Sequence, residues 1–453
     1  MPSVKIAIIG GGSPYVPGIL YSFAHSGAVL SGSEIALMDV DPSRLPIMTA
    51  LGRRMMAEAG AGLTVTDTTD LDQALRGANF VLTNFRPGGL EGLRMDEEIP
   101  NQYDALGQET TGPGGTFFAL RAIPQALRLC RRMEDICPEA WLINYLNPTN
   151  FIADAVRRET AVRYIAICDG GGNYLRYFLP ELLGLEQADA DTDVADVPSA
   201  PSAYIRLRAR AAGVNHHSWL MELRIGDEDG YPPLLERVRG AEGKGRSFNR
   251  KQHEFGIWFL ERYGVWPANL SYLYPYFNYD DALADYRAGH SLYRMFMADL
   301  PQHWRNFEAM AKGEIPIYLD PSKHHTDVGH GDLAVQVMLA IASNASREFH
   351  VNVPNEGSIA NLPQDAIVEV PALVDASGVR PLCMGDLPKG VVGLVQSLIA
   401  WEKLSVDAAL SGDKNLVLQA ILAHPWVLSI QQAESISNEM FSAHAAHLPQ
   451  FQG

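Results

Sequence analysis

The residue types best suited to chemistry fall in four short polar clusters, and each follows an apolar run. They are Asn84-Phe85-Arg86, Asn144-Tyr145-Leu146-Asn147-Pro148, Cys168-Asp169-Gly170-Gly171-Gly172 and Gly213-Val214-Asn215-His216-His217-Ser218-Trp219. Open α/β sheets place their ligands at such strand ends. A cysteine (Cys168) and a histidine (His216) from different elements, beside the carboxylate of Asp169 and the amide of Asn147, predict an open transition-metal site with room for substrate oxygens. Taken singly, each residue has a plainer interpretation: a buried cysteine, a capping aspartate or a core histidine.

A second pattern, at the start of the chain, predicts a dinucleotide site. The apolar run Val4-Lys5-Ile6-Ala7-Ile8-Ile9 leads into Gly10-Gly11-Gly12-Ser13, and Asp39 ends the next apolar run. Glycine lets the backbone turn sharply and lets a pyrophosphate approach the amides of a helix N-terminus. Asp39 would accept hydrogen bonds from ribose hydroxyls and repel a 2′-phosphate, which favours NAD over NADP. Asn84 and Arg86 complete the predicted cofactor-binding set.

The glycine spacing departs from G-x-G-x-x-G, so a plain strand-turn-helix is the alternative interpretation.

The elements that position these clusters alternate between strands and helices. Residues 1 to about 190 show further apolar strands at 35–38, 80–83, 141–144 and 164–168, separated by helical stretches. This alternation predicts a doubly wound, Rossmann-like α/β sheet in a domain spanning 1–190. Residues 187–203 read as a loop, and a strand at 203–210 opens a second lobe of mixed α+β type, 191–453. Long helices are expected at 332–343 and 391–410.

Composition narrows the classes of partner. The chain has 453 residues, is 47% hydrophobic and 20% charged, and carries a formal net charge of −17. Such a negative charge argues against nucleic acid or an anionic membrane as partner. The chain has no uninterrupted apolar stretch long enough to span a membrane and no basic region before the first strand, so a cytoplasmic protein is expected. Four cysteines in this length do not form a disulfide framework.

Several longer motifs lie in the same order as in one known family. They are Asp96-Glu97-Glu98-Ile99-Pro100, Gly107-Gln108-Glu109-Thr110-Thr111-Gly112-Pro113-Gly114-Gly115, Asn144 to Pro148, Cys168-Asp169, Gly213 to Trp219 and Ser271-Tyr272-Leu273. With these motifs the chain resembles the NAD- and divalent-metal-dependent glycosidases of glycoside hydrolase family 4 and closely related NAD-dependent glycosidases. The resemblance runs from Gly10 to about Lys403.

The resemblance implies a role for each of five residues. Cys168 and His216 would be the metal ligands, with Mn²⁺ the usual metal of the family. Asn147 would hold substrate hydroxyls near the metal, and Tyr272 matches the family's catalytic base. Asp169 matches the general acid of the subgroup that acts on α-linked 6-phosphoglucosides. For Tyr272, simple packing in an aromatic-rich stretch is the alternative.

The implied mechanism explains why a hydrolase would use a dinucleotide. NAD oxidises the sugar at C3, and the metal polarises the resulting ketone, so that a tyrosinate can remove the C2 proton. Elimination expels the C1 leaving group as Asp169 protonates it. Water then adds to the enone and NADH returns the hydride, so the net reaction is hydrolysis.

The substrate is expected to be anionic at C6. Guanidinium groups suit a tetrahedral anion, and Arg86, Arg94 and Arg287 match the family's substrate region. Further donors would come from His217, Lys323, His324 and His325, although the cluster 323–325 has a simple exposed loop as its alternative.

Two departures bear on the substrate: Gly170-Gly171 replaces the Met-Pro of the phospho-α-glucosidase subgroup, and Pro275 interrupts the tyrosine run. They favour an α-sulfoquinovosidase, with 6-phospho-α-glucosidase and α-glucuronidase as alternatives of the same mechanism.

A dehydrogenase of the 2-hydroxy-acid type is the alternative from another class, and a non-catalytic NAD sensor is a third. Dehydrogenases of that type are commonly shorter than this chain and use a His-Asp pair without metal. Relatives form dimers or tetramers, so a homodimer or homotetramer is expected.

Overall fold

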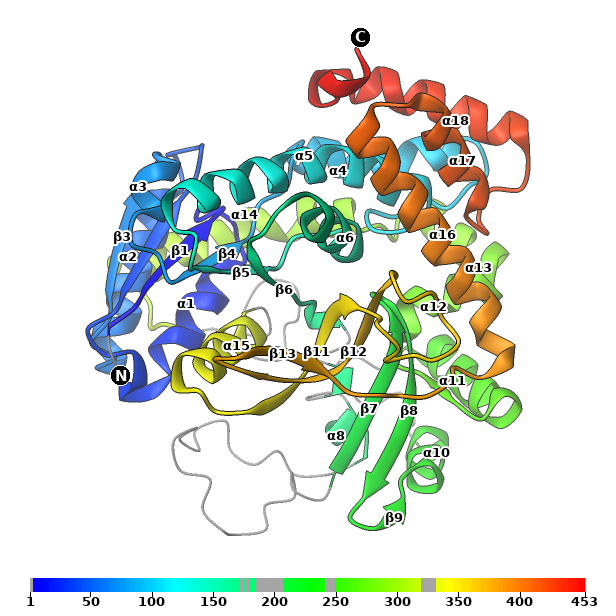
Figure 1. The fold of residues 1–453 in the computed structure, drawn as a ribbon, viewed down its shortest axis with the longest axis horizontal. Coiled ribbons are helices and arrows are strands. Elements are labelled where there is room, and N and C mark those ends of the chain that lie inside the picture. Colours follow the sequence, from blue (N-terminus) through cyan, green and yellow to red (C-terminus); the bar gives the residue numbers. More distant parts are fainter. Residues whose placement is uncertain are drawn as a thin grey trace.

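The fold is a large mixed sheet flanked by helices, seen in a computed structural model (Figure 1). The structure describes residues 3–170, 174–175, 179–183, 207–240, 249–318 and 331–452. The expected loop at 187–203 and the predicted donors Lys323, His324 and His325 lie outside these residues.

The first half of the chain forms six parallel strands. They are β1 (Lys5–Ile9), β2 (Glu34–Met38), β3 (Thr64–Thr68), β4 (Phe80–Thr83), β5 (Trp141–Asn144) and β6 (Arg163–Ala166). Their order in the sheet is β6-β5-β4-β1-β2-β3, and every pair among them is parallel. This is the strand order of the doubly wound dinucleotide-binding fold, so the Rossmann-like prediction is confirmed.

The helices of this half lie against the sheet, and their buried apolar side chains pack on it to form the core. They are α1 (Val16–Ala24), α2 (Leu45–Ala59), α3 (Leu71–Leu75), α4 (Gly89–Gln102), α5 (Gly112–Ile136) and α6 (Thr149–Glu159), with a short 3-10 turn η1 (Gly27–Leu30). Pro17 and Pro113 stand in the first turns of α1 and α5, where proline is tolerated because the first amides have no partner within the helix.

The second half adds antiparallel strands to the same sheet. They are β7 (Leu207–Val214), β8 (His217–Ile225), β9 (Glu228–Asp229), β10 (Trp266–Pro267), β11 (Arg347–Pro354), β12 (Ile367–Asp375) and β13 (Gly378–Pro381). β11 joins β6 through the pair Asn352 and Ala166, and β12, β7, β8 and β10 follow outward. One continuous sheet therefore runs through both halves, and the domain boundary near residue 190 stays a prediction.

The remaining helices come from the second half of the chain, and several of them pack against helices of the first half. They are α8 (Leu179–Leu182), α10 (Tyr231–Gly240), α11 (Arg250–Tyr263), α12 (Leu270–Phe277), α13 (Tyr279–Arg287), α14 (Leu292–Lys312), α15 (Asp332–Ser343), α16 (Lys389–Ser411), α17 (Lys414–Ala423) and α18 (Ile430–Ala443), with the 3-10 turns η3 (Ala445–His447) and η4 (Pro449–Phe451). Figure 1 shows the chain returning, through α16 to α18, to the helices α4 and α5 of the first half. None of the described helices combines the length and apolar character that a bilayer crossing requires.

Most elements lie where the sequence pattern placed them. The strands expected at 35–38, 80–83 and 141–144 and the helices at 332–343 and 391–410 are confirmed within two residues at their ends. The pattern of apolar runs does not predict β3, because this edge strand reads Thr-Val-Thr-Asp-Thr and buries only Val65. β6 ends at Ala166, so Cys168 lies just beyond the strand instead of within it.

Candidate functional site: a cavity at the carboxyl ends of the parallel strands

A single large cavity brings most of the predicted site residues together. Its volume is about 1780 Å³, and it lies where β1, β2, β4, β5 and β6 end. Its walls include the predicted residues Gly10, Gly12, Ser13, Asp39, Asn84, Arg86, Asn147, Cys168, Asp169, His216 and Tyr272. The polar clusters that follow separate strands in the sequence therefore face one space.

The glycine turn after β1 requires glycine for steric reasons. Gly10 has φ +96°, and a Cβ there would lie 2.1 Å from the carbonyl oxygen of Asn84. Gly11 is behind the cavity wall, where its amide and that of Gly10 both donate to the Met38 carbonyl at 2.8 Å. The Gly12 amide donates to Asp39 Oδ2 at 2.9 Å, which holds this carboxylate beside the turn. The lack of side chains at the turn leaves room in the cavity for a pyrophosphate, and the Asp39 carboxylate lies beside it for a ribose.

Cys168 and His216 form the pair expected of metal ligands. Cys168 Sγ lies 3.2 Å from His216 Nε2. With zinc-like bond lengths of ~2.3 Å to sulfur and ~2.05 Å to nitrogen, two ligands of one ion lie about 3.1 Å apart at a right angle and about 3.6 Å apart at a tetrahedral angle. The observed separation therefore fits two adjacent ligands of one ion. Among the described residues, no group of three or more His, Cys, Asp or Glu side chains is arranged to hold an ion.

The tautomer of His216 follows from its hydrogen bonds. Gln108 Oε1 accepts from the amide of Thr110 at 2.6 Å and from its hydroxyl at 3.0 Å. The Thr110 hydroxyl has its proton in this bond, so it can only accept from His216 Nδ1, which is 3.1 Å away. The proton of the imidazole is therefore on Nδ1, and Nε2 directs its lone pair at Cys168.

The backbone conformation and the burial of His216 also suit a metal ligand. It lies in the short turn between β7 and β8 with φ +66°, an uncommon conformation for a residue with a side chain. Burial lowers the pKa of His216 to about 3, and the neighbouring His217 adds to this. The imidazole is thus neutral at ordinary pH, as a metal ligand must be.

Tyr272 stacks directly on the imidazole of His216. Its ring centroid is 3.9 Å from that of His216, and the planes differ by 13°. Burial raises the pKa of Tyr272 well above its usual range, and the negative charges of Glu109 and Cys168 add to this. A tyrosinate here needs a nearby positive charge, which a dication at Cys168 and His216 would supply.

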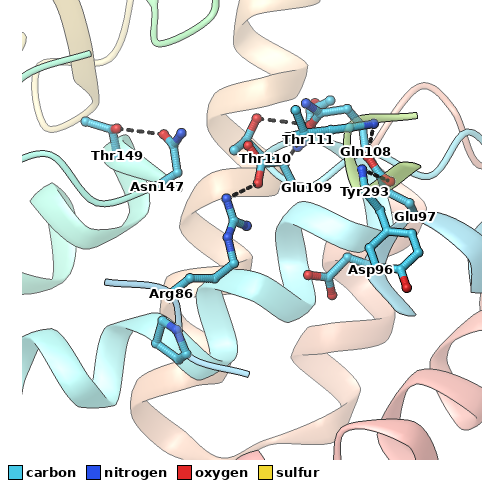
Figure 2. Close-up of polar contacts among 12 residues, drawn as sticks. Arg86, Asp96, Glu97, Gln108, Glu109, Thr110, Thr111, Asn147, Thr149 and Tyr293 are labelled. Carbon is cyan, nitrogen blue, oxygen red and sulfur yellow. Dashed lines mark hydrogen bonds and ion pairs between the residues drawn. The ribbon is translucent and has the colours of Figure 1, made fainter. Parts of the chain in front are cut away.

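Asp169 and Asn147 lie on the wall beside the ligand pair. Asp169 is 5% exposed, and a side-chain hydrogen bond links it to Tyr145, whose pKa is raised by burial and by this carboxylate. Asn147 Oδ1 accepts from the Thr149 hydroxyl at 2.9 Å, which orients the amide (Figure 2). Gly170 brings the backbone close, because a Cβ there would lie 3.5 Å from the His216 ring and 3.6 Å from Cys168 Sγ.

The predicted arginines divide into one inside the cavity and two outside it. Arg86 pairs with the buried Glu109 (Figure 2), and its guanidinium carbon lies 4.8 Å above the Phe118 ring. Arg94 instead pairs with Glu91 and Glu98 of its own helix, and Arg287 pairs with Asp104. These two arginines are not on the cavity wall, because their acidic partners hold them at the surface. His217 is also off the wall, buried behind it with Nδ1 bonded to the Asn215 carbonyl.

Three residues of the site were not predicted individually. Thr110 fixes the His216 tautomer, and Tyr15 and Tyr145 line the cavity around Asp169. Thr110 was visible only as part of the motif at 107–115. Tyr15, directly after the glycine turn, carried a positional signal, whereas Tyr145 looked like any aromatic at a strand end.

Comparison with known proteins agrees with this geometry. Residues 5–174 match the model of the family 4 glycosyl hydrolases, and residues 211–427 match the model of the family 4 glycosyl hydrolase C-terminal domain. A 6-phospho-beta-glucosidase of Escherichia coli (strain K12) is 31% identical over 99% of this chain and 97% of its own length. A 6-phospho-alpha-glucosidase of Leptotrichia buccalis is 28% identical over 99% of both chains.

Among solved structures, a 6-phospho-alpha-glucosidase from gut microorganisms, in complex with NAD and Mn²⁺, superimposes with a TM-score of 0.84. It is 25% identical, and the match covers 98% of this chain and 99% of that one. Identity of 31% along nearly the whole length of both chains shows the family. The protein is a glycosidase, and the chain belongs to family 4 of the glycosyl hydrolases.

Proposed function

We propose that the protein is an NAD- and Mn²⁺-dependent glycosidase that cleaves 6-phospho-α-glucosides. The observation that carries the proposal is the contact of 3.2 Å between Cys168 Sγ and His216 Nε2, with Tyr272 stacked on the same imidazole. This group shares its cavity with the glycine turn and Asp39. The relative crystallised with NAD and Mn²⁺ supports both cofactors.

The two cofactors would supply chemistry that side chains lack. When bound, NAD takes a hydride from C3 of the sugar and later returns it, while Mn²⁺ stabilises negative charge that develops on the sugar oxygens. Tyr272, on the imidazole of the ligand pair, is placed to remove the C2 proton. Asp169 protonates the departing C1 oxygen, and Asn147 hydrogen-bonds to a sugar hydroxyl.

The substrate proposal differs from the preference drawn from the sequence. The α-sulfoquinovoside stays a prediction, but the relatives reported above are named for 6-phosphoglucosides, and these names support phosphate at C6. They include both anomers, so the α assignment depends on Asp169 as general acid. Arg86 is a half-buried arginine on the described cavity wall, and its pairing with Glu109 would have to rearrange if it bound the anion.

The test is hydrolysis of p-nitrophenyl α-glucoside 6-phosphate in D₂O, with and without NAD and Mn²⁺. We expect nitrophenol release that requires both cofactors, deuterium at C2 of the sugar, and no accumulation of NADH. The β-anomer and the α-sulfoquinovoside run in parallel, and a faster rate with either would replace the substrate proposal while leaving the mechanism. Stoichiometric NADH with an intact glycosidic bond would instead indicate a dehydrogenase.

A variant separates the role of Asp169 from general damage to the site. Nitrophenolate departs with little protonation, whereas an alkyl group needs an acid. Asp169→Asn should therefore lose far more activity on methyl α-glucoside 6-phosphate than on the nitrophenyl substrate. Equal losses on both would contradict the general-acid role.

A further inference from the structure

One face of helix α14 carries a stripe of apolar side chains that lines the cavity. The proposed mechanism assigns no role to this stripe. Leu292, Phe296, Leu300 and Trp304 all line the cavity, and they recur at every fourth residue. Residues at this spacing share one helix face. One face of α14, a helix from the second half of the chain, is therefore a wall of the space beside the glycine turn.

This wall is held firmly at both ends. At its start, the Glu97 carboxylate accepts from the backbone amides of Leu292 at 3.1 Å and Tyr293 at 3.0 Å (Figure 2). A carboxylate at this position satisfies the helix's first amides and interacts favourably with its dipole. Near its other end, Arg54 of α2 donates to the carbonyls of Met310 and Ile315. The stripe is thus a fixed surface of the cavity.

The two ends of the stripe face different parts of the cavity. Phe296 packs edge-on against Tyr15, with centroids 6.2 Å apart, and Tyr15 lies close enough to Asp169 and Glu109 for both to raise its pKa. Phe296 therefore marks the catalytic end. Trp304 lies at the other end, under the guanidinium of Arg44 at 4.2 Å.

The position of Arg44 identifies what lies next to Trp304. Arg44 Cβ is 3.3 Å from where a Cβ on Gly12 would be, and Asp39 Oδ2 is 3.0 Å from the same point. Gly12, Asp39 and Arg44 are thus immediate neighbours. Asp39 is the acidic residue suited to the adenosine ribose, so Trp304 stands at the adenosine end of the cavity. Val40, which is apolar, 85% exposed and on the cavity wall, adds apolar surface there.

We propose that Trp304, braced by the Arg44 cation, is the surface on α14 that binds the adenosine half of NAD. The inference depends on the proposed function only in requiring that NAD binds. Aromatic rings form favourable stacking contacts with purines, and the cation holds the indole in one orientation, which reduces the entropy lost on binding. The second half of the chain thereby contributes directly to an affinity that the sequence motifs assign to the first half.

The test is calorimetric titration of the full-length protein with NAD and with ADP-ribose, which lacks nicotinamide. Trp304→Ala should weaken both ligands by about 5- to 150-fold, the range for loss of one base-aromatic contact, and Trp304→Phe should recover much of that loss. Arg44→Ala should weaken both ligands less. Mn²⁺ affinity should be unchanged in all three variants, because Trp304 is at the opposite end from Cys168.

A matched control is available on α11. Trp258 lies under Arg262 at 4.9 Å, as Trp304 lies under Arg44, but it is not on the cavity wall. Trp258→Ala should leave both titrations unchanged. The inference is overturned if Trp304→Ala binds ADP-ribose as the unmodified protein does, or if only NAD and not ADP-ribose is weakened. If the unmodified protein binds neither ligand, the proposed function fails first, so the two failures are distinguishable.

Discussion

Replacing Thr110 by valine should weaken metal binding without touching a metal ligand. The hydroxyl of Thr110 accepts from His216 Nδ1 at 3.1 Å and donates to Gln108 Oε1 at 3.0 Å. Valine has nearly the same shape but cannot accept a hydrogen bond. The imidazole of His216 would then lose the contact that keeps its proton on Nδ1 and its Nε2 lone pair directed at Cys168.

The size of the effect follows from the burial of this contact. Thr110 is 5% exposed and His216 is 3% exposed, so water cannot replace the lost partner without a rearrangement. Loss of an outer contact to a ligating histidine weakens metal binding by about 10- to 100-fold. That range corresponds to about 1.4–2.7 kcal/mol, comparable to the ~1–3 kcal/mol of a buried donor left without an acceptor.

The assay is titration of the protein with Mn²⁺, followed by the electron paramagnetic resonance signal of the free ion. Thr110→Ser keeps the hydroxyl and should retain most of the affinity. Thr116→Val is the matched control, since the buried Thr116 hydroxyl accepts from Trp401 Nε1 at 2.7 Å, away from the cavity wall. That variant should lower stability and leave the Mn²⁺ affinity unchanged.

The reasoning is refuted if Thr110→Val binds Mn²⁺ as tightly as the unmodified protein while its thermal unfolding shows a folded chain. Equal losses in Thr110→Val and Thr116→Val would also refute it, because the effect would then be one of general stability.

Three further outcomes are expected. Gly10→Ala should abolish NAD binding and lower the melting temperature, because the new Cβ would lie 2.1 Å from the Asn84 carbonyl oxygen; normal NAD titration would contradict this. Burial raises the pKa of Glu402 to about 8, so the free energy of unfolding should fall as pH rises from about 4.5 to 8. Glu402→Gln should flatten that slope in denaturant titrations at pH 5 and pH 8, and an unaltered slope would exclude Glu402 as its source. Chelation should remove activity that Mn²⁺ restores, and Cys168→Ala should remove activity that added Mn²⁺ does not restore; activity after exhaustive chelation would count against the metal.

Much of the fold was predictable because a run of apolar residues indicates a buried strand. An apolar run ending in glycine marks β1 and its turn, and similar runs mark β2, β4 and β5. β3 was missed for the converse reason: an edge strand with one buried residue lacks such a run. The one continuous sheet was also not visible, since β11 meets β6 through residues far apart in the sequence.

The sequence predicted only those parts of the candidate site that follow the carboxyl ends of adjacent parallel strands. The carboxyl ends of adjacent parallel strands lie at one edge, which is why Asn147 and Cys168 share a cavity with the glycine turn. Arg86 and Arg94 looked equally suitable for an anion. Tertiary packing puts Arg86 against Glu109 inside the cavity, and leaves Arg94 at the surface with acids of its own helix.

By itself, the sequence determined the residue types and local geometry on which the chemistry depends: a glycine where φ is positive at Gly10, a carboxylate at Asp39, and a thiol and an imidazole at Cys168 and His216. Only the tertiary structure decided the tautomer of His216, through the hydroxyl of Thr110, and the wall that ends in Trp304. Backbone conformation and hydrophobic periodicity are properties of short segments, so they can be read locally. A hydrogen bond or a cavity wall built from distant segments depends on how those segments pack.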